Sequence, residues 1–179
     1  MGKYVYGEWL VPIVDYYRIL KKKEFNYEII MPILIAVFVT GIYNHLGCVL
    51  PALLKLRDVL PASLAILIGF SITCITILIT SNTNNIIEIK GKKTDSRIIG
   101  SETISIYQWF LVMFIYVLLM QIFLLLVVFF TAFALRVCSN DYFITALLFI
   151  EVFLTLHVLF ILIRNISNFY FVFFKNKID

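Results

Sequence analysis

The stretch that decides the fold is a pair of apolar runs, 106-IYQWFLVMFIYVLLMQIFLLLVVFFTAFAL-135 and 142-YFITALLFIEVFLTLHVLFILI-163. A short polar turn, 136-RVCSND-141, joins them. Neither run contains proline or glycine, and both exceed the ~20 apolar residues that a helix needs to cross a hydrocarbon core of ~30 Å. Only helices and closed barrels satisfy their backbone hydrogen bonds in lipid. The stretch therefore predicts a hairpin of two transmembrane helices.

The composition extends this prediction to the whole chain. Hydrophobic residues make up 62% of it and charged residues 15%, with a mean hydropathy of +0.99, whereas an ordinary soluble domain is about 45–50% apolar and about 25% charged. Two further apolar segments, roughly 29–47 and 59–80, bring the predicted spans to four. We therefore predict an all-α polytopic membrane protein, in which residues 1–179 form a single four-helix transmembrane domain.

The segment 1–27 precedes the first predicted span and is rich in Tyr and Trp. Drawn as a helix from Tyr4 to Lys23, it has a narrow polar stripe flanked by aromatic side chains, which is typical of a helix at the bilayer surface. The basic run Lys21, Lys22 and Lys23 would then lie among anionic head groups. A tail that packs against the bundle and a helix that docks a partner are the alternatives.

Prolines set the expected boundaries of the first two spans. Pro32 and Pro61 are each expected in the first turn of a span, where the missing N–H costs nothing. Pro51 is expected to begin a short separate helix in the connection 48–58. The polar residues 81–105 are expected to form the longest connection, because glycines and an Asn-rich start interrupt them.

Basic residues indicate the orientation of the chain. Five lie in the N-terminal segment, four in the connection 81–105 and three at or after Arg164, against three in the two other connections. The positive-inside rule then places both termini and the connection 81–105 in the cytoplasm. The abundance of Ile, Asn, Lys and Phe suggests an AT-rich bacterial genome, so the expected location is the bacterial inner membrane. A net charge of +4 is too weak to indicate nucleic acid as a partner.

Glu151 has the highest expected free-energy cost of insertion into the membrane, because it lies well inside the fourth span. Ionisable residues at such depth are rare and mark ion or proton pathways by default. The alternative is a protonated carboxyl that hydrogen-bonds a neighbouring helix and only holds the bundle together. Thr155 shares its face of the helix. Both roles remain open from the sequence.

His157 lies near the middle of the same span and is expected on a different face from Glu151. If the two runs pair as an antiparallel hairpin, residues at equal depth have numbers that add to about 277, which places His157 beside Gln121. A His–Gln hydrogen bond between the two helices is the expected contact. Arg164 and Asn168 share the face of His157.

Catalytic patterns are missing from the sequence. It contains no HExxH, no CxxC, no Gly-rich phosphate loop and no GxSxG. The two histidines lie on different predicted spans at different depths. We therefore expect a protein that is not an enzyme and holds no metal or cofactor.

In chain length, number of spans and the basic connection 81–105, the chain resembles the small four-span membrane components of bacterial phage-defence modules, such as the membrane subunit of Kiwa-type systems. The resemblance implies a membrane pore, sensor or effector that is controlled by a cytosolic protein. The resemblance assigns no role to any single residue, because it concerns only the architecture of the chain. Four spans cannot enclose a wide path, so a homo-oligomer is expected. The predicted contacts with the membrane surface or partner are Lys21, Lys22, Lys23, Lys90, Lys92, Lys93 and Arg97.

Two other functions remain open. A small proton-coupled transporter would use Glu151 as its coupling carboxylate, although small four-span exporters carry their acid in the first span. A membrane scaffold or assembly factor would use its intramembrane polar residues only to hold helices together.

Overall fold

The computed structural model describes residues 7–100, 102–137 and 140–174, and nearly all of them are helical. Four helices are long and apolar enough to cross a membrane: Lys22–His45, Val49–Thr80, Ile106–Val137 and Asp141–Tyr170. The predicted all-α polytopic fold is confirmed, and the chain is an integral membrane protein. The elements are η1 (Glu8–Leu10), α1 (Val11–Ile19), α2 (Lys22–Phe25), η2 (Asn26–Ile30), α3 (Met31–His45), α4 (Val49–Thr80), α5 (Asn84–Gly91), β1 (Lys93–Ile99), β2 (Glu102–Ser105), α6 (Ile106–Val137) and α7 (Asp141–Phe174).

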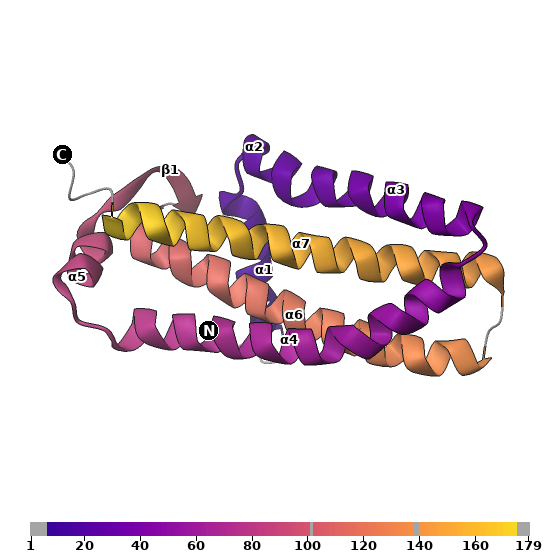
Figure 1. Ribbon diagram of the computed structural model, residues 1–179. Coiled ribbons are helices and arrows are strands. Elements are labelled where there is room, and N and C mark those ends of the chain that lie inside the picture. The colour runs from indigo at the N-terminus through magenta and orange to yellow at the C-terminus, as the bar shows by residue number, and fades with distance from the viewer. Residues whose placement is uncertain (1–6, 101, 138–139, 175–179) are drawn as a thin grey trace.

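The long helices form a bundle around α6 and α7 (Figure 1). Helix α4 packs along α6 and also contacts α7, whereas α3 packs mainly on α7. Leucines and a valine fill the space where α4, α6 and α7 meet. The side chains that face away from the bundle are largely apolar, as a hydrocarbon surrounding requires. The buried members of this central cluster are Leu60, Leu64, Leu124, Val128 and Leu154.

The first long helix begins at Lys22, earlier than the expected start at residue 29, because α2, η2 and α3 follow one another without a break. Its segment Asn26–Ile30 is a π-helix, directly before Pro32. Proline has no N–H to donate to the carbonyl four residues earlier, which is that of Glu28. The irregular turn therefore lies where the regular hydrogen-bond ladder is interrupted.

The expected boundary of the second span is wrong. Pro51 does not head a separate short helix, because Val49–Thr80 is one continuous helix with Pro61 in its interior. Proline removes one backbone hydrogen bond and usually kinks or breaks a helix. Here Leu60 and Leu64 are buried against α6 and α7 on either side of Pro61, and this packing keeps the helix continuous past it.

The connection 81–105 is not a plain loop. It forms α5 and a hairpin of the two antiparallel strands β1 and β2. Gly100 lies in the turn between the strands with a φ of 67°, a conformation that glycine adopts without steric cost. Ile86 and Ile89 of α5 are buried against the start of α6. We call this end of the bundle, where α5, β1 and β2 lie (Figure 1), the hairpin end.

Helix α1 crosses α6 near the hairpin end (Figure 1). Tyr16 and Ile19 are buried in a cluster with residues of α6 and α7. Trp9, Val14 and Tyr17 remain exposed on the other side. An N-terminal helix is therefore confirmed, with one face held by the bundle. The location of its exposed aromatic face at the bilayer surface stays a prediction.

Candidate functional site

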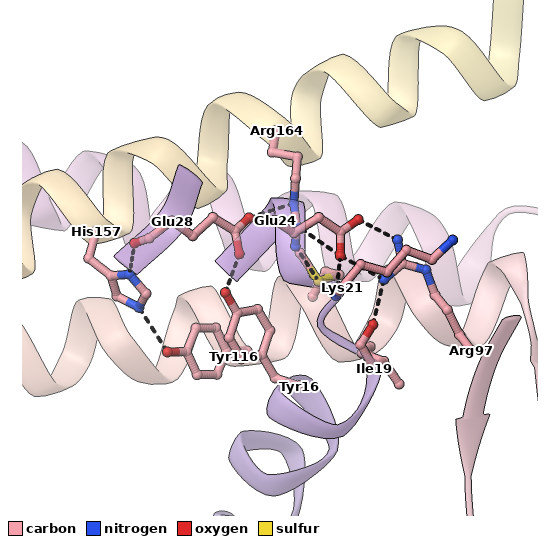
Figure 2. A network of polar contacts seen from close by, with 10 residues as sticks. Tyr16, Ile19, Lys21, Glu24, Glu28, Arg97, Tyr116, His157 and Arg164 are labelled. Carbon is pink, nitrogen blue, oxygen red and sulfur yellow. Dashed lines mark hydrogen bonds and ion pairs between the residues drawn. The ribbon is translucent and has the colours of Figure 1, made fainter. Parts of the chain in front are cut away.

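Two acids and two bases meet inside the hairpin end (Figure 2). Glu24 comes from α2, Glu28 from η2, Arg97 from β1 and Arg164 from α7. We call these four side chains the ion-pair network. Their formal charges cancel, which is how charges can be buried in a region of low dielectric constant. The network joins elements that are far apart in the sequence.

Glu24 is the centre of the network. Arg97 Nη1 donates to Glu24 Oε2 at 3.1 Å, and the second terminal nitrogen of Arg97 bonds the other carboxylate oxygen. Arg164 Nη1 lies 3.2 Å from Glu24 Oε2. The backbone N–H of Lys21 also donates to this oxygen, at 2.9 Å. A single carboxylate thus holds the strand β1 and the helix α7 at once.

Arg97 also anchors the hairpin to the N-terminal segment. Its Nη1 donates to the backbone carbonyl of Ile19 at 2.7 Å, at the end of α1. Its guanidinium lies 4.2 Å from the ring centroid of Trp109, a cation–π distance. The side chain is 8% exposed. Arg97 was predicted at the membrane surface, but it is a buried structural contact instead.

Glu28 is fully buried at the inner end of the network. Arg164 Nε lies 2.5 Å from Glu28 Oε1, and the Tyr16 hydroxyl donates to Oε2 (Figure 2). Burial and the nearby negative charge of Glu28 raise the pKa of Tyr16 well above its usual range. Tyr16 therefore remains a neutral donor, and a fully buried carboxylate is held between a cation and a phenol.

His157 extends the polar region from Glu28 into the bundle. Its Nδ1 lies 2.6 Å from the backbone carbonyl of Glu28, so Nδ1 carries the proton and donates. Its Nε2 then accepts from the Tyr116 hydroxyl at 2.8 Å. Because Pro32 has no N–H, the Glu28 carbonyl lacks its regular helix donor and is free to accept from His157.

Tyr116 is the hub between this histidine and helix α1. Its ring stacks on Tyr16 with centroids 3.6 Å apart and an interplanar angle of 3°. Its oxygen also lies 3.3 Å from the hydroxyl of Tyr17, which is partly exposed. A chain of polar contacts therefore runs from the exposed face of α1 to a fully buried backbone carbonyl.

The prediction of a hydrogen bond between His157 and Gln121 is wrong. Gln121 is fully buried, and neither its side-chain oxygen nor its nitrogen has a hydrogen-bond partner among the described residues. His157 turns toward Tyr116 and Glu28 instead. The two residues were expected at similar depths in the membrane, but depth does not determine the rotation of a helix about its axis.

Glu151 lies outside the ion-pair network. Its side chain is fully buried, and both carboxylate oxygens lack a hydrogen-bond partner within the described part of the chain. Thr131 of α6 lies beside the carboxylate as a polar neighbour, and Arg57 of α4 acts on it through its charge. The Thr131 hydroxyl itself donates to the backbone carbonyl of Val127 at 3.0 Å. The Thr155 hydroxyl donates to the Glu151 backbone carbonyl at 2.7 Å and not to its carboxylate. Glu151, Thr131 and Arg57 form a second, smaller polar group.

The predicted basic contacts separate into two sets. Lys21, Lys92, Lys93 and Arg97 line one pocket at the hairpin end. The remaining lysines are exposed: Lys22 and Lys23 project from α2, and Lys90 lies over the Tyr107 ring at 5.1 Å. Within the described residues, no group of three His, Cys, Asp or Glu side chains is arranged to hold a metal ion.

Sequence reasoning missed Glu24 and Glu28 as site residues. Both fell in the segment before the expected first span, where acids are normally exposed to water. Their spacing of four residues was an available signal, since it places both on one face of a helix. Arg164 had been placed on the face of His157, and the structure brings both toward Glu28.

Comparison with known proteins finds no match: no family model, no curated protein and no solved structure matches the chain.

Proposed function

We propose that the chain is a membrane effector or sensor whose elements at the hairpin end control the packing of α7. The observation that carries this proposal is the position of Glu24, which holds β1 through Arg97 and α7 through Arg164. A force on the hairpin would pull Arg97 away from Glu24. The bundle would then contain an unbalanced charge, which strongly favours rearrangement.

The proposal needs a signal that reaches the hairpin end. We propose a cytosolic protein as its source, as in the phage-defence modules that the architecture resembles. The exposed lysines Lys22, Lys23 and Lys90 give that end a positive surface, and an acidic partner surface would be attracted to it. Side chains fill the interior of one bundle, so a single copy leaves no open path through its centre. We therefore propose that the response is a rearrangement of the contacts between neighbouring copies of the chain.

Glu24→Gln tests the proposal. Glutamine keeps the shape of the side chain but cannot balance Arg97 and Arg164, so the resting arrangement should be lost. In proteoliposomes we expect ion leakage to rise about fivefold or more, the lower range of typical coupling between sites. Hydrogen exchange of the α1 backbone should accelerate in the same variant, because α1 is tied to Arg97 through Ile19.

The matched control is Glu102→Gln, which removes an exposed carboxylate from β2 of the same hairpin. It should leave both leakage and exchange unchanged. A Glu24→Gln protein that loosens α1 but leaks no more than this control would refute an effector function of the network.

A small proton-coupled transporter is the second candidate, and Glu151 is the observation that favours it. A fully buried carboxylate whose oxygens have no hydrogen-bond partner among the described residues is suited to exchange protons. Arg57 lies near enough to respond to its charge.

Glu151→Gln is expected to reduce flux driven by a pH gradient by about tenfold or more, because glutamine cannot release a proton. Dye-reported proton flux in liposomes measures this. Glu88→Gln on the exposed side of α5 is the control. Equal flux in wild type, Glu151→Gln and Glu88→Gln would leave Glu151 as a structural residue.

A further inference from the structure

A pocket of about 220 Å³ lies where the hairpin meets the first turn of α6. Lys21, Lys92 and Lys93 provide three cationic side chains around it, and Ile106 and Trp109 provide an apolar wall. Arg97 also lines it, but its charge is balanced by Glu24. No acidic side chain is among the described residues that line it. The three lysines are exposed and take part in no described side-chain ion pair. The pocket is therefore strongly positive and accessible.

Trp109 adds an independent observation. Its indole Nε1 is buried and has no hydrogen-bond partner among the described residues. An indole nitrogen can only donate, so it requires an acceptor. An unpaired buried donor is costly, and native structures rarely leave one without a partner. The same ring packs against the guanidinium of Arg97, which places it beside the positive charges.

The N-terminus of α6 also adds positive charge at this pocket. Ile106 begins a helix of 32 residues, whose N-terminus carries a partial positive charge. Its first turn is capped, since the Gln108 backbone N–H donates to Ser105 Oγ at 3.2 Å and the Ser105 N–H donates back to Gln108 Oε1 at 2.8 Å. The helix dipole adds to the charges of the lysines and does not replace them.

We infer that this pocket binds a phosphate group, as a phosphate ester or as free phosphate. Phosphate matches the pocket because it carries charge and several acceptor oxygens, which several separate donors can share. Lysines suit it as point charges, and the buried indole N–H becomes a further donor only if binding shifts the Trp109 ring. The place is the interface level of a spanning helix, where basic pockets bind anionic head groups. The inference does not depend on the proposed effector function.

The test uses Trp109 as its own reporter. The chain contains two tryptophans, and Trp9 is exposed in η1. Trp9→Phe therefore leaves Trp109 as the only indole, in a full-length protein held in nanodiscs of neutral phosphatidylcholine. Inorganic phosphate is titrated in one arm, and phosphatidylglycerol replaces part of the neutral lipid in the other. Binding should change Trp109 emission in a saturable way in one arm or in both.

A matched pair of variants separates a pocket from a general surface charge. Lys92→Gln with Lys93→Gln removes two charges from the pocket, whereas Lys22→Gln with Lys23→Gln removes two exposed charges that do not line it. We expect the first pair to weaken binding about tenfold or more and the second by less than about threefold, because charge-assisted contacts are lost only in the first. Arg97 is left intact because it belongs to the ion-pair network.

Each outcome decides the inference. Saturation by phosphatidylglycerol alone assigns the pocket to a lipid head group, and saturation by inorganic phosphate assigns it to a soluble phosphate compound. Both results require the tenfold loss in the Lys92 and Lys93 variant. Equal losses of affinity in the two variants would show that only the general surface potential acts, and this would overturn the inference. The absence of a saturable response in both arms would also overturn it.

Discussion

Arg164→Leu is expected to lower the free energy of unfolding by about 3–5 kcal/mol, the cost of removing one partner from a buried ion pair. The side chain of Arg164 is 11% exposed and pairs with both Glu24 and Glu28. Leucine would leave Glu28, which is fully buried, without its cation. Unfolding of the purified protein in mixed micelles, followed by circular dichroism over a detergent titration, measures the change.

Two further variants test whether this loss of stability comes from the buried ion pair. Arg136→Leu removes an exposed arginine at the opposite end of α6, and it should change the free energy of unfolding by less than about 0.5 kcal/mol. Arg164→Leu combined with Glu28→Leu removes both charges, so it should recover part of the loss. A double variant less stable than the sum of its single changes would contradict an ion pair between the two residues.

Tyr116→Ala has the second large expected effect, a loss of about 3–5 kcal/mol in the free energy of unfolding. The ring of Tyr116 is fully buried and stacks on Tyr16, and its hydroxyl donates to His157 Nε2. Alanine would therefore leave a cavity where α1 meets the bundle. The same detergent titration measures this loss. Tyr142→Ala is the control, because Tyr142 is 88% exposed.

Tyr116→Phe separates packing from hydrogen bonding. Phenylalanine keeps the stack on Tyr16 but leaves His157 Nε2 without its donor, which should cost about 1–3 kcal/mol. If Tyr116→Phe were as damaging as Tyr116→Ala, the hydroxyl would dominate over the packing of the ring. If it had no effect, the contact between Tyr116 and His157 would contribute nothing to stability.

The spans could be predicted from the sequence because lipid imposes one rule on every residue within it. The run 106–135 coincides closely with α6, and the run 142–163 begins where α7 begins, since both are mainly apolar and free of proline. The expected end of the fourth span near residue 163 is too early, because α7 continues through polar residues to Phe174. The rule failed at α4, where Pro61 was expected to begin a helix and lies inside one. Local propensity favoured a break there, and packing around Leu60 and Leu64 outweighed it.

The site could be predicted only in part. His157 and Glu151 were recognisable because polar residues inside an apolar run stand out. Their partners were not, because contacts between helices depend on rotation about each axis. The pairing of Glu24 with Arg97 joins residues in two segments that each look like ordinary surface sequence. Only the arrangement of the whole bundle brings them together.

The separation of Glu28 and Arg164 along the chain has a consequence for biosynthesis. A ribosome adds roughly 5–20 residues per second, so Arg164 leaves it on the order of ten seconds after Glu28. During this delay the first helix carries two acids whose partner on α7 does not yet exist. The polar contacts that fix the first helix against the bundle are therefore completed only when the last helix has been made.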